Sequence, residues 1–302
     1  MADAKGADDR VLFDLDKDSR IATITFNNPG QRNSYDKAMR DEVARCLDVV
    51  VDDDDITVVL LRGADGVFST GANMNNAYGW YGSDGNGSAE GASRPAKNRP
   101  SQRRRLIVDR KTFDFYHEFL GFPKVTVGEI SGFALGGGFE MALMTDISVI
   151  ARDTRIGMPA TRFLGPALGS LHMFFHRLGP VLARRLLLTG DIIDAAAVDH
   201  LGVFTETCDR ADVTARARYW AEKAARMPAD GVVIAKEAFR LVEQSQAYQG
   251  EEVASYLFHA FGTNLQFSPG EFNFVKTRAE HGTKEAFRLR DEHFHVPEPD
   301  LS

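Results

Sequence analysis

Ser131-Gly-Phe-Ala-Leu-Gly-Gly-Gly-Phe-Glu140 is the stretch of sequence that decides the fold. It follows the largely apolar run 125–130, a pattern that predicts a buried strand, a glycine turn and a helix beginning near Gly138. Three consecutive glycines remove every Cβ from a short arc of backbone, so a ligand can approach the main-chain N–H groups closely. The helix start adds unpaired donors and the positive end of a dipole, which favour a developing oxyanion. With Glu140 in the first helical turn, this segment suits carbonyl chemistry.

A second segment repeats this design. Residues 57–62 form a β-branched, apolar run, and the following Gly63-Ala-Asp-Gly66 is typical of a turn. Phe68-Ser-Thr-Gly-Ala-Asn-Met74 then forms a turn of small residues that leads toward a helix. The sequence therefore carries the order strand, small-residue turn, helix twice.

Together, these two segments resemble the paired signature of the enoyl-CoA hydratase/isomerase (crotonase) superfamily. The likeness continues at three further places, Arg32-Asn-Ser-Tyr35, Leu187-Leu-Thr-Gly-Asp191 and Phe274-Val-Lys-Thr-Arg278. It covers roughly residues 10–282 and is weakest at 76–104 and 159–178. A single glycine-rich turn would not establish a family, but an ordered set of this kind identifies one.

Strands alternating with helices, followed by a helical tail, indicate an α/β fold. The expected strands lie at 11–15, 21–26, 57–62, 125–130, 147–151 and 203–207, and the expected helices at 36–51, 104–120, 138–145, 171–188, 194–201, 213–226, 231–244, 250–265 and 270–281. The resemblance narrows this to a crotonase-like spiral of stacked ββα units, with two sheets flanked by helices and a helical C-terminal oligomerisation region. We expect the spiral core at residues 1–209 and the helical region at 210–302.

The C-terminal region is rich in aromatic side chains that so small a helical unit cannot cover alone: Phe258, Phe261, Phe267, Phe272 and Phe274. This excess predicts subunit association. The resemblance implies a homotrimer, or a hexamer built as a dimer of trimers.

Composition excludes several classes of protein. A net charge of −7 over 302 residues argues against general binding to nucleic acid or to an anionic membrane. Two cysteines cannot form a disulfide framework and lack the spacing of a metal site, so no metal is expected. The polar, acidic N-terminus is unlike a secretory or transit peptide, and no apolar run is long enough to span a bilayer. We expect a cytoplasmic protein.

The family resemblance implies acyl-CoA thioester substrates and no cofactor beyond the coenzyme A of the substrate. Negative charge then develops on the thioester oxygen, and the donors matching the family motif are the N–H groups of Ala72 and Gly137. Loss of one such donor typically costs about 3 kcal/mol of barrier. Glu140 matches one of the two catalytic glutamates of the family's hydratases and would act on water or on the carbon α to the carbonyl.

The second acid is missing. Family hydratases usually carry a Pro-Glu pair where this sequence has Pro159 and Ala160. Either Glu140 handles both protons of a syn addition, or another group substitutes, or the reaction is not simple hydration. The candidate substitutes are Glu129, Asp146, His172 and His176, and for each of them the residue pattern favours a structural role.

Residues implied to bind coenzyme A follow from the same resemblance. Arg32 lies on the early turn whose family counterpart is near the CoA phosphates. Ala72, Asn73 and Met74 resemble the backbone stretch beside adenine, with Asn73 in place of the more usual aspartate. Phe274 and Lys276 resemble a tail pair that reaches the CoA of a neighbouring subunit.

The 76–104 loop is rich in Gly and Arg, and its aromatic residues Tyr78, Trp80 and Tyr81 suggest a lid over the acyl pocket.

The leading interpretation is an enoyl-CoA hydratase, a lyase of fatty acid metabolism. An isomerase or acyl-CoA hydrolase of the same superfamily is the alternative within the family. A non-catalytic scaffold that binds CoA or RNA is the alternative from a different class. The acyl-chain specificity and the choice between trimer and hexamer are left open by the sequence.

Overall fold

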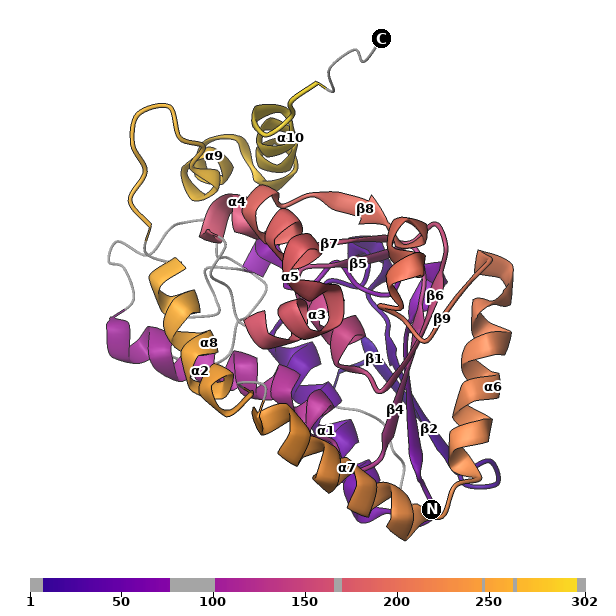
Figure 1. Ribbon diagram of the computed structural model, residues 1–302. Helices are drawn as coiled ribbons and strands as arrows, with labels where there is room; N and C mark the ends of the chain where they lie inside the picture. The colour runs from indigo at the N-terminus through magenta and orange to yellow at the C-terminus, as the bar shows by residue number, and fades with distance from the viewer. Residues whose placement is uncertain (1–7, 77–100, 166–169, 246–247, 263–264, 298–302) are drawn as a thin grey trace.

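A twisted sheet with helices on both faces forms the centre of the molecule (Figure 1). This computed structural model describes residues 8–76, 101–165, 170–245, 248–262 and 265–297. The sheet has six strands in the order β1-β2-β3-β4-β6-β9. They are β1 (Val11–Asp16), β2 (Ile21–Phe26), β3 (Val58–Gly63), β4 (Val125–Ile130), β6 (Ile147–Ala151) and β9 (Glu206–Cys208). β1 and β2 form the predicted antiparallel hairpin, and every other pairing in this sheet is parallel.

A second, three-stranded sheet lies at one end of the first. It consists of β5 (Phe133–Leu135), β7 (Arg155–Gly157) and β8 (Ile192–Asp194), with β5 parallel to β7 and β7 antiparallel to β8. The sequence predicted only a glycine turn at residues 132–137, so β5 corrects that expectation. Strands of three residues are too short for an alternating pattern to mark them. The confirmed α/β spiral of two sheets depends on them.

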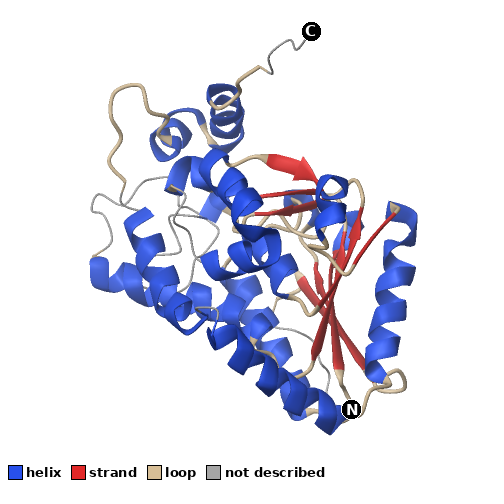
Figure 2. Cartoon of the chain, in the orientation of Figure 1, coloured by secondary structure: helices blue, strands red, loops and turns tan. Residues whose placement is uncertain are grey.

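Helices surround both sheets, as the blue ribbons of Figure 2 show. They are α1 (Lys37–Asp52), α2 (Gln102–Leu120), α3 (Gly137–Met144), α4 (Thr161–Leu164), α5 (Leu171–Thr189), α6 (Val213–Ala225), α7 (Ala229–Ser245), α8 (Tyr248–Gly262), α9 (Phe274–His281) and α10 (Thr283–His293), with short 3-10 turns η1 (Pro29–Gln31), η2 (Ala64–Gly66), η3 (Met74–Asn76), η5 (Ala195–Leu201) and η6 (Arg210–Asp212). α5 is interrupted where expected, because Gly179 has a left-handed φ of 68° before Pro180.

Several element boundaries differ from the sequence-based prediction. The last strand of the large sheet is residues 206–208 rather than 203–207, and α9 begins at Phe274 rather than at residue 270. The Asn273 side chain accepts a hydrogen bond from the main-chain N–H of Lys276 and so marks the start of α9. Neither α4 nor α10 was predicted. α4 has only four residues, and α10 has a strongly polar sequence.

Both faces of the large sheet are buried. Val59 and Leu61 of β3 face the larger core under α1, α2, α3 and α5, whereas Val58 and Leu60 face a smaller core under α6. This alternation follows from the two-residue period of a strand, and burial on both sides explains the continuous apolar run that identified it. The larger core extends to the glycine turns and so gives them a rigid support.

The helices after residue 209 pack in different places in the fold. α6 packs directly on the large sheet, and α9 and α10 pack against each other beside α4 (Figure 1). Lys236 of α7 reaches Asp146 at 2.5 Å, and the other carboxylate oxygen of Asp146 accepts a hydrogen bond from the Thr126 amide. The division of the chain at residue 210 stays a prediction. In the described ranges no helix combines the length and apolarity needed to cross a membrane.

Candidate active site

The two small-residue turns of the sequence lie against each other. Ser69 of the first turn donates its main-chain N–H to Phe133 O at 2.9 Å, and its own carbonyl accepts from the Leu135 N–H at 3.0 Å. A Cβ on Gly71 would lie 2.8 Å from the nitrogen of Gly137, and a Cβ on Gly138 would lie 2.3 Å from Ser69 O. Segments separated by more than 60 positions in the sequence therefore form one continuous site.

Glycine is required here because the backbones touch. Gly71 has a left-handed φ of 82°, and Gly136 has a φ of 55° with ψ at −128°. Both conformations are disfavoured for residues with a side chain. Gly136 precedes α3, so the amide of Gly137 belongs to the first turn of that helix, where main-chain donors lack intrahelical acceptors.

The amide of Ala72 is oriented by its neighbours. Gly71 O accepts from the Tyr35 N–H at 3.0 Å, and the Asn73 N–H donates to Tyr35 O at 2.8 Å. Because successive groups on extended backbone alternate in direction, the N–H of Ala72 points away from Tyr35. Within the described ranges, neither the Ala72 nor the Gly137 amide donates a hydrogen bond to the protein. Two main-chain donors on adjoining segments are suited to hold one oxyanion.

Glu140 lies in the first turn of α3 and is 5% exposed. Its main-chain N–H donates to Gly136 O at 3.1 Å, so the same turn holds Glu140 and the Gly137 amide. The helix dipole favours a negative charge at this end of α3. A carboxylate in this place can accept and return a proton next to a bound carbonyl.

A buried tyrosine pair stands beside this turn. The hydroxyls of Tyr35 and Tyr116 are hydrogen-bonded to each other. A Cβ on Gly137 would lie 1.9 Å from the Tyr35 hydroxyl and 2.2 Å from that of Tyr116. Burial raises the pKa of both phenols, and the charge of Glu140 raises it further. The sequence analysis did not predict this pair, although Tyr35 belongs to the Arg32–Tyr35 segment that resembles the family.

Asn33 fixes the early turn that carries Arg32. Its fully buried amide accepts from the Asn28 N–H at 2.9 Å and donates to the carbonyls of Ala64 and Val67 at 2.9 and 2.5 Å. Arg32 and Asn33 both have left-handed φ, of 52° and 54°. Asparagine tolerates this conformation better than most residues. The early turn is thus bonded to the strand end that precedes the first small-residue turn.

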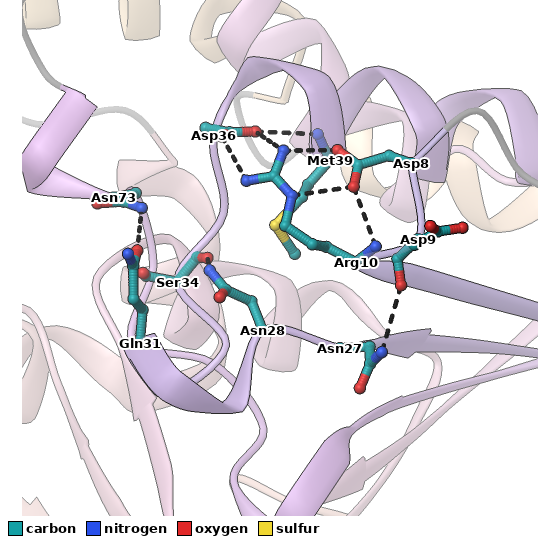
Figure 3. A network of polar contacts seen from close by, with 10 residues as sticks. All are labelled: Asp8, Asp9, Arg10, Asn27, Asn28, Gln31, Ser34, Asp36, Met39 and Asn73. Atoms are coloured by element: carbon teal, nitrogen blue, oxygen red, sulfur yellow. Dashed lines mark hydrogen bonds and ion pairs between the residues drawn. The ribbon is translucent and has the colours of Figure 1, made fainter. Parts of the chain in front are cut away.

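Figure 3 shows the rest of the support for this early turn. Asp36 caps α1 by accepting from the Met39 N–H at 3.1 Å, and Arg10 links Asp36 to Asp8 through ion pairs of 2.7 and 2.6 Å. The Asn28 side chain donates to Ser34 O at 2.9 Å. These bonds hold the backbone on both sides of Tyr35.

The residues implied to contact adenine and phosphates lie at the rim of the site. Arg32 is exposed, with its guanidinium 4.9 Å from the centre of the Phe133 ring. The buried side chain of Asn73 donates to Gln31 Oε1 and caps Asn75, which orients the following η3 turn. Met74 O accepts a hydrogen bond from Arg278 of α9. Arg278 was not predicted, and it ties the C-terminal helices to this rim.

Phe274 and Lys276 have different surroundings. Phe274 is fully buried between Phe163 and Phe287, with ring centres 5.0 Å from each, and so attaches α9 to α4 and α10. Lys276 is exposed on the same helix. Of the two, only Lys276 presents its side chain to solvent in this chain, and its role toward coenzyme A stays a prediction.

The place of the expected second acid holds Ala160, which packs at the edge of the core directly before α4. Each of the four candidate substitutes contacts other residues of the protein, and their structural role stays a prediction. Glu129 accepts from the Thr214 hydroxyl at 2.8 Å on the α6 face of the sheet. Asp146 binds Thr126 and Lys236, and the rings of His172 and His176 stack with centres 5.8 Å apart. The aromatic lid residues Tyr78, Trp80 and Tyr81 lie outside the described residues.

Comparison with known proteins agrees with this geometry. The sequence profile of the enoyl-CoA hydratase/isomerase family matches residues 16–93 and 94–284. A probable enoyl-CoA hydratase of Mycobacterium tuberculosis, echA8, is 27% identical over 275 residues, which is 89% of this chain and 96% of that protein. The 2,3-dehydroadipyl-CoA hydratase of Escherichia coli is 25% identical over 265 residues, covering 87% of this chain and 95% of the relative.

Solved structures show the same fold. An enoyl-CoA hydratase from Mycobacterium smegmatis superposes with a TM-score of 0.78 at 27% identity, covering 94% of this chain and 93% of that one. An enoyl-CoA hydratase/isomerase from Xanthobacter autotrophicus Py2 has a TM-score of 0.80 at 25% identity, with 95% and 99% covered. The chain belongs to the enoyl-CoA hydratase/isomerase family and has the crotonase fold.

Proposed function

We propose that this protein adds water reversibly to the double bond of a 2-enoyl-CoA thioester. The observation that carries the proposal is the contact between the two turns, which places the Ala72 and Gly137 amides on adjoining backbone segments beside Glu140. Hydratase names among the relatives support the same reaction class. Lyase chemistry on acyl-CoA needs no metal or separate cofactor in this scheme.

Glu140 performs both proton transfers in the proposed mechanism. Its carboxylate takes a proton from water as the water oxygen bonds to the β-carbon. Electron density moves to the thioester oxygen, where the two amides stabilise the enolate. The enolate then collapses, and the proton on Glu140 passes to the α-carbon on the same face. A single acid is proposed because Ala160 has no ionisable group.

Binding of coenzyme A is proposed along the rim described above. Arg32 and Lys276 are exposed cations suited to phosphate, and the backbone of residues 72–74 is proposed to lie beside adenine. Phe274 would contribute through its hold on α9 rather than by touching the ligand.

A homotrimer or a dimer of trimers is proposed as the working form. Large apolar side chains are exposed along α7 and α8: Val233, Ile234, Phe239, Leu241, Val242, Val253, Leu257, Phe258 and Phe261. Exposed apolar side chains in this number support association. Equilibrium sedimentation would distinguish three subunits from six, and a monomer at micromolar concentration would contradict the proposal.

The test of activity is hydration of crotonyl-CoA, followed as loss of the conjugated thioester absorbance. The wild type should turn over, and Glu140→Gln should lose on the order of 10²–10⁴-fold in kcat. Glu222→Gln on the exposed face of α6 is the matched control and should keep full activity. Unchanged turnover in Glu140→Gln would refute the mechanism.

The same series of assays distinguishes hydration from the alternatives left open by the missing second acid. Double-bond migration in 3-butenoyl-CoA would identify an isomerase, and thiol release would identify a hydrolase. RNA retention that falls steeply with salt, without CoA affinity, would identify a scaffold.

A further inference from the structure

Tyr35 is the residue that touches both turns of the candidate site. Its main-chain N–H and C=O bond to Gly71 O and the Asn73 N–H, at 3.0 and 2.8 Å, on either side of Ala72. These two bonds determine the direction of the Ala72 amide. The main chain of Tyr35 therefore holds the first donor.

The side chain of Tyr35 reaches the second donor. Its hydroxyl occupies the space where a Cβ of Gly137 would stand, 1.9 Å from that position, and Tyr116 shares the same space at 2.2 Å. The Gly137 Cα thus rests on the hydroxyl pair, while its nitrogen faces Gly71. Phe26 and Phe115 pack around the Tyr35 ring, with centres 6.2 and 6.4 Å away, and restrict its movement.

The tyrosine pair is neutral at working pH. Burial is the main cause that raises the pKa of both hydroxyls, and the Glu140 charge opposes a phenolate as well. A neutral, mutually hydrogen-bonded pair is unsuited to act as a base. It is suited to support a backbone segment at a constant distance.

We propose that Tyr35 is a positioning residue that sets the distance and direction between the Ala72 and Gly137 amides, with Tyr116 holding its hydroxyl against Gly137. The inference rests on the proposed function for the identity of the ligand as a thioester carbonyl. Tyr35 acts through the two amides and does not itself touch the reacting atoms.

The probe is butyryl-CoA carrying ¹³C at the thioester carbonyl, which has no double bond to hydrate. Polarisation by two amides should move its carbonyl resonance downfield on binding to the wild type. Tyr35→Phe keeps the ring and the main chain, and should lose a substantial part of this shift with Kd changed less than about threefold. With crotonyl-CoA it should lower kcat about tenfold and leave KM within threefold.

A second pair of variants separates positioning from stability. Tyr35→Phe leaves the buried Tyr116 hydroxyl without its partner and should lower Tm. Tyr35→Phe with Tyr116→Phe removes both hydroxyls and should recover Tm without recovering the carbonyl shift. Tyr219→Phe, on exposed α6, should change nothing.

Two results would overturn the inference: an unchanged carbonyl shift in Tyr35→Phe, or a shift that returns together with Tm in the double variant. A wild type that binds and polarises butyryl-CoA but hydrates no enoyl-CoA would refute the proposed function alone. If bound butyryl-CoA shows no carbonyl shift in the wild type, the two amides do not polarise the carbonyl. That result would refute both the oxyanion site and this inference.

Discussion

Gly71→Ala tests whether the two turns form one oxyanion site. Gly71 has a left-handed φ of 82°, and an added Cβ would stand 2.8 Å from the Gly137 nitrogen and 2.7 Å from Leu135 O. Both neighbours are main-chain atoms, so no side chain can rotate to make room. The substitution therefore strains the first turn and displaces the amide of the second.

The magnitude follows from these distances. Ordinary contact begins at 3.4 Å, so the Gly137 nitrogen has to move by about 0.6 Å, a displacement at which catalytic geometry is lost. Loss of one oxyanion donor costs about 3 kcal/mol, which lowers kcat by about 10²-fold. The left-handed backbone adds about 1–2 kcal/mol to the loss of stability, and the overpacking adds about 1–3 kcal/mol.

The assay compares kcat for crotonyl-CoA hydration with the free energy of unfolding from urea titration. Gly202→Ala is the matched control, because Gly202 has a left-handed φ of 65° with no atom near its Cβ position. It should lose about 1 kcal/mol of stability and no activity. A folded Gly71→Ala protein with kcat within threefold of the wild type would show that the Gly137 amide does not serve catalysis. If Gly71→Ala and Gly202→Ala lose the same activity, the loss in Gly71→Ala comes from destabilisation of the fold.

Three further predictions concern stability. Burial, with a smaller contribution from Asp48, raises the pKa of Glu118 to about 7, so the folded state keeps a proton that the unfolded state releases near pH 4.5. Stability should therefore fall as pH rises from 4.5 to 7. By urea titration, the free energy of unfolding of Glu118→Gln should exceed that of the wild type by about 1 kcal/mol at pH 8 but not at pH 4. Lys236→Met leaves Asp146 without its cation and should cost about 2 kcal/mol. A double-mutant cycle with Asp146→Asn that shows no coupling would contradict this partly buried ion pair. Asn33→Ala removes three hydrogen bonds and a residue that tolerates left-handed φ, and should cost about 3 kcal/mol by calorimetry; a loss below 1 kcal/mol would show that the turn holds without this amide.

Most long elements could be predicted from the sequence because their patterns are local. The bounds expected for β4 and β6 are the observed ones, and α1 begins at its Asp36 cap. The three-residue strands β5, β7 and β8 escaped prediction because they exist only through their pairing with one another. The contact of Arg278 was not predicted for the same reason, because its hydrogen-bond acceptor is a carbonyl 204 positions away in the sequence.

The sequence alone determined which types of residue the candidate site contains. The sequence carries glycines where backbones touch, a glutamate in the first turn of a helix, and an alanine where the family resemblance implies a second acid. Only the tertiary structure decided that Gly71 and Gly137 are in contact, that Tyr35 joins Tyr116 across 81 positions, and that Phe274 is buried against Phe163. Side-chain type and local backbone preference are encoded residue by residue, whereas distances between remote segments arise only when the whole core packs.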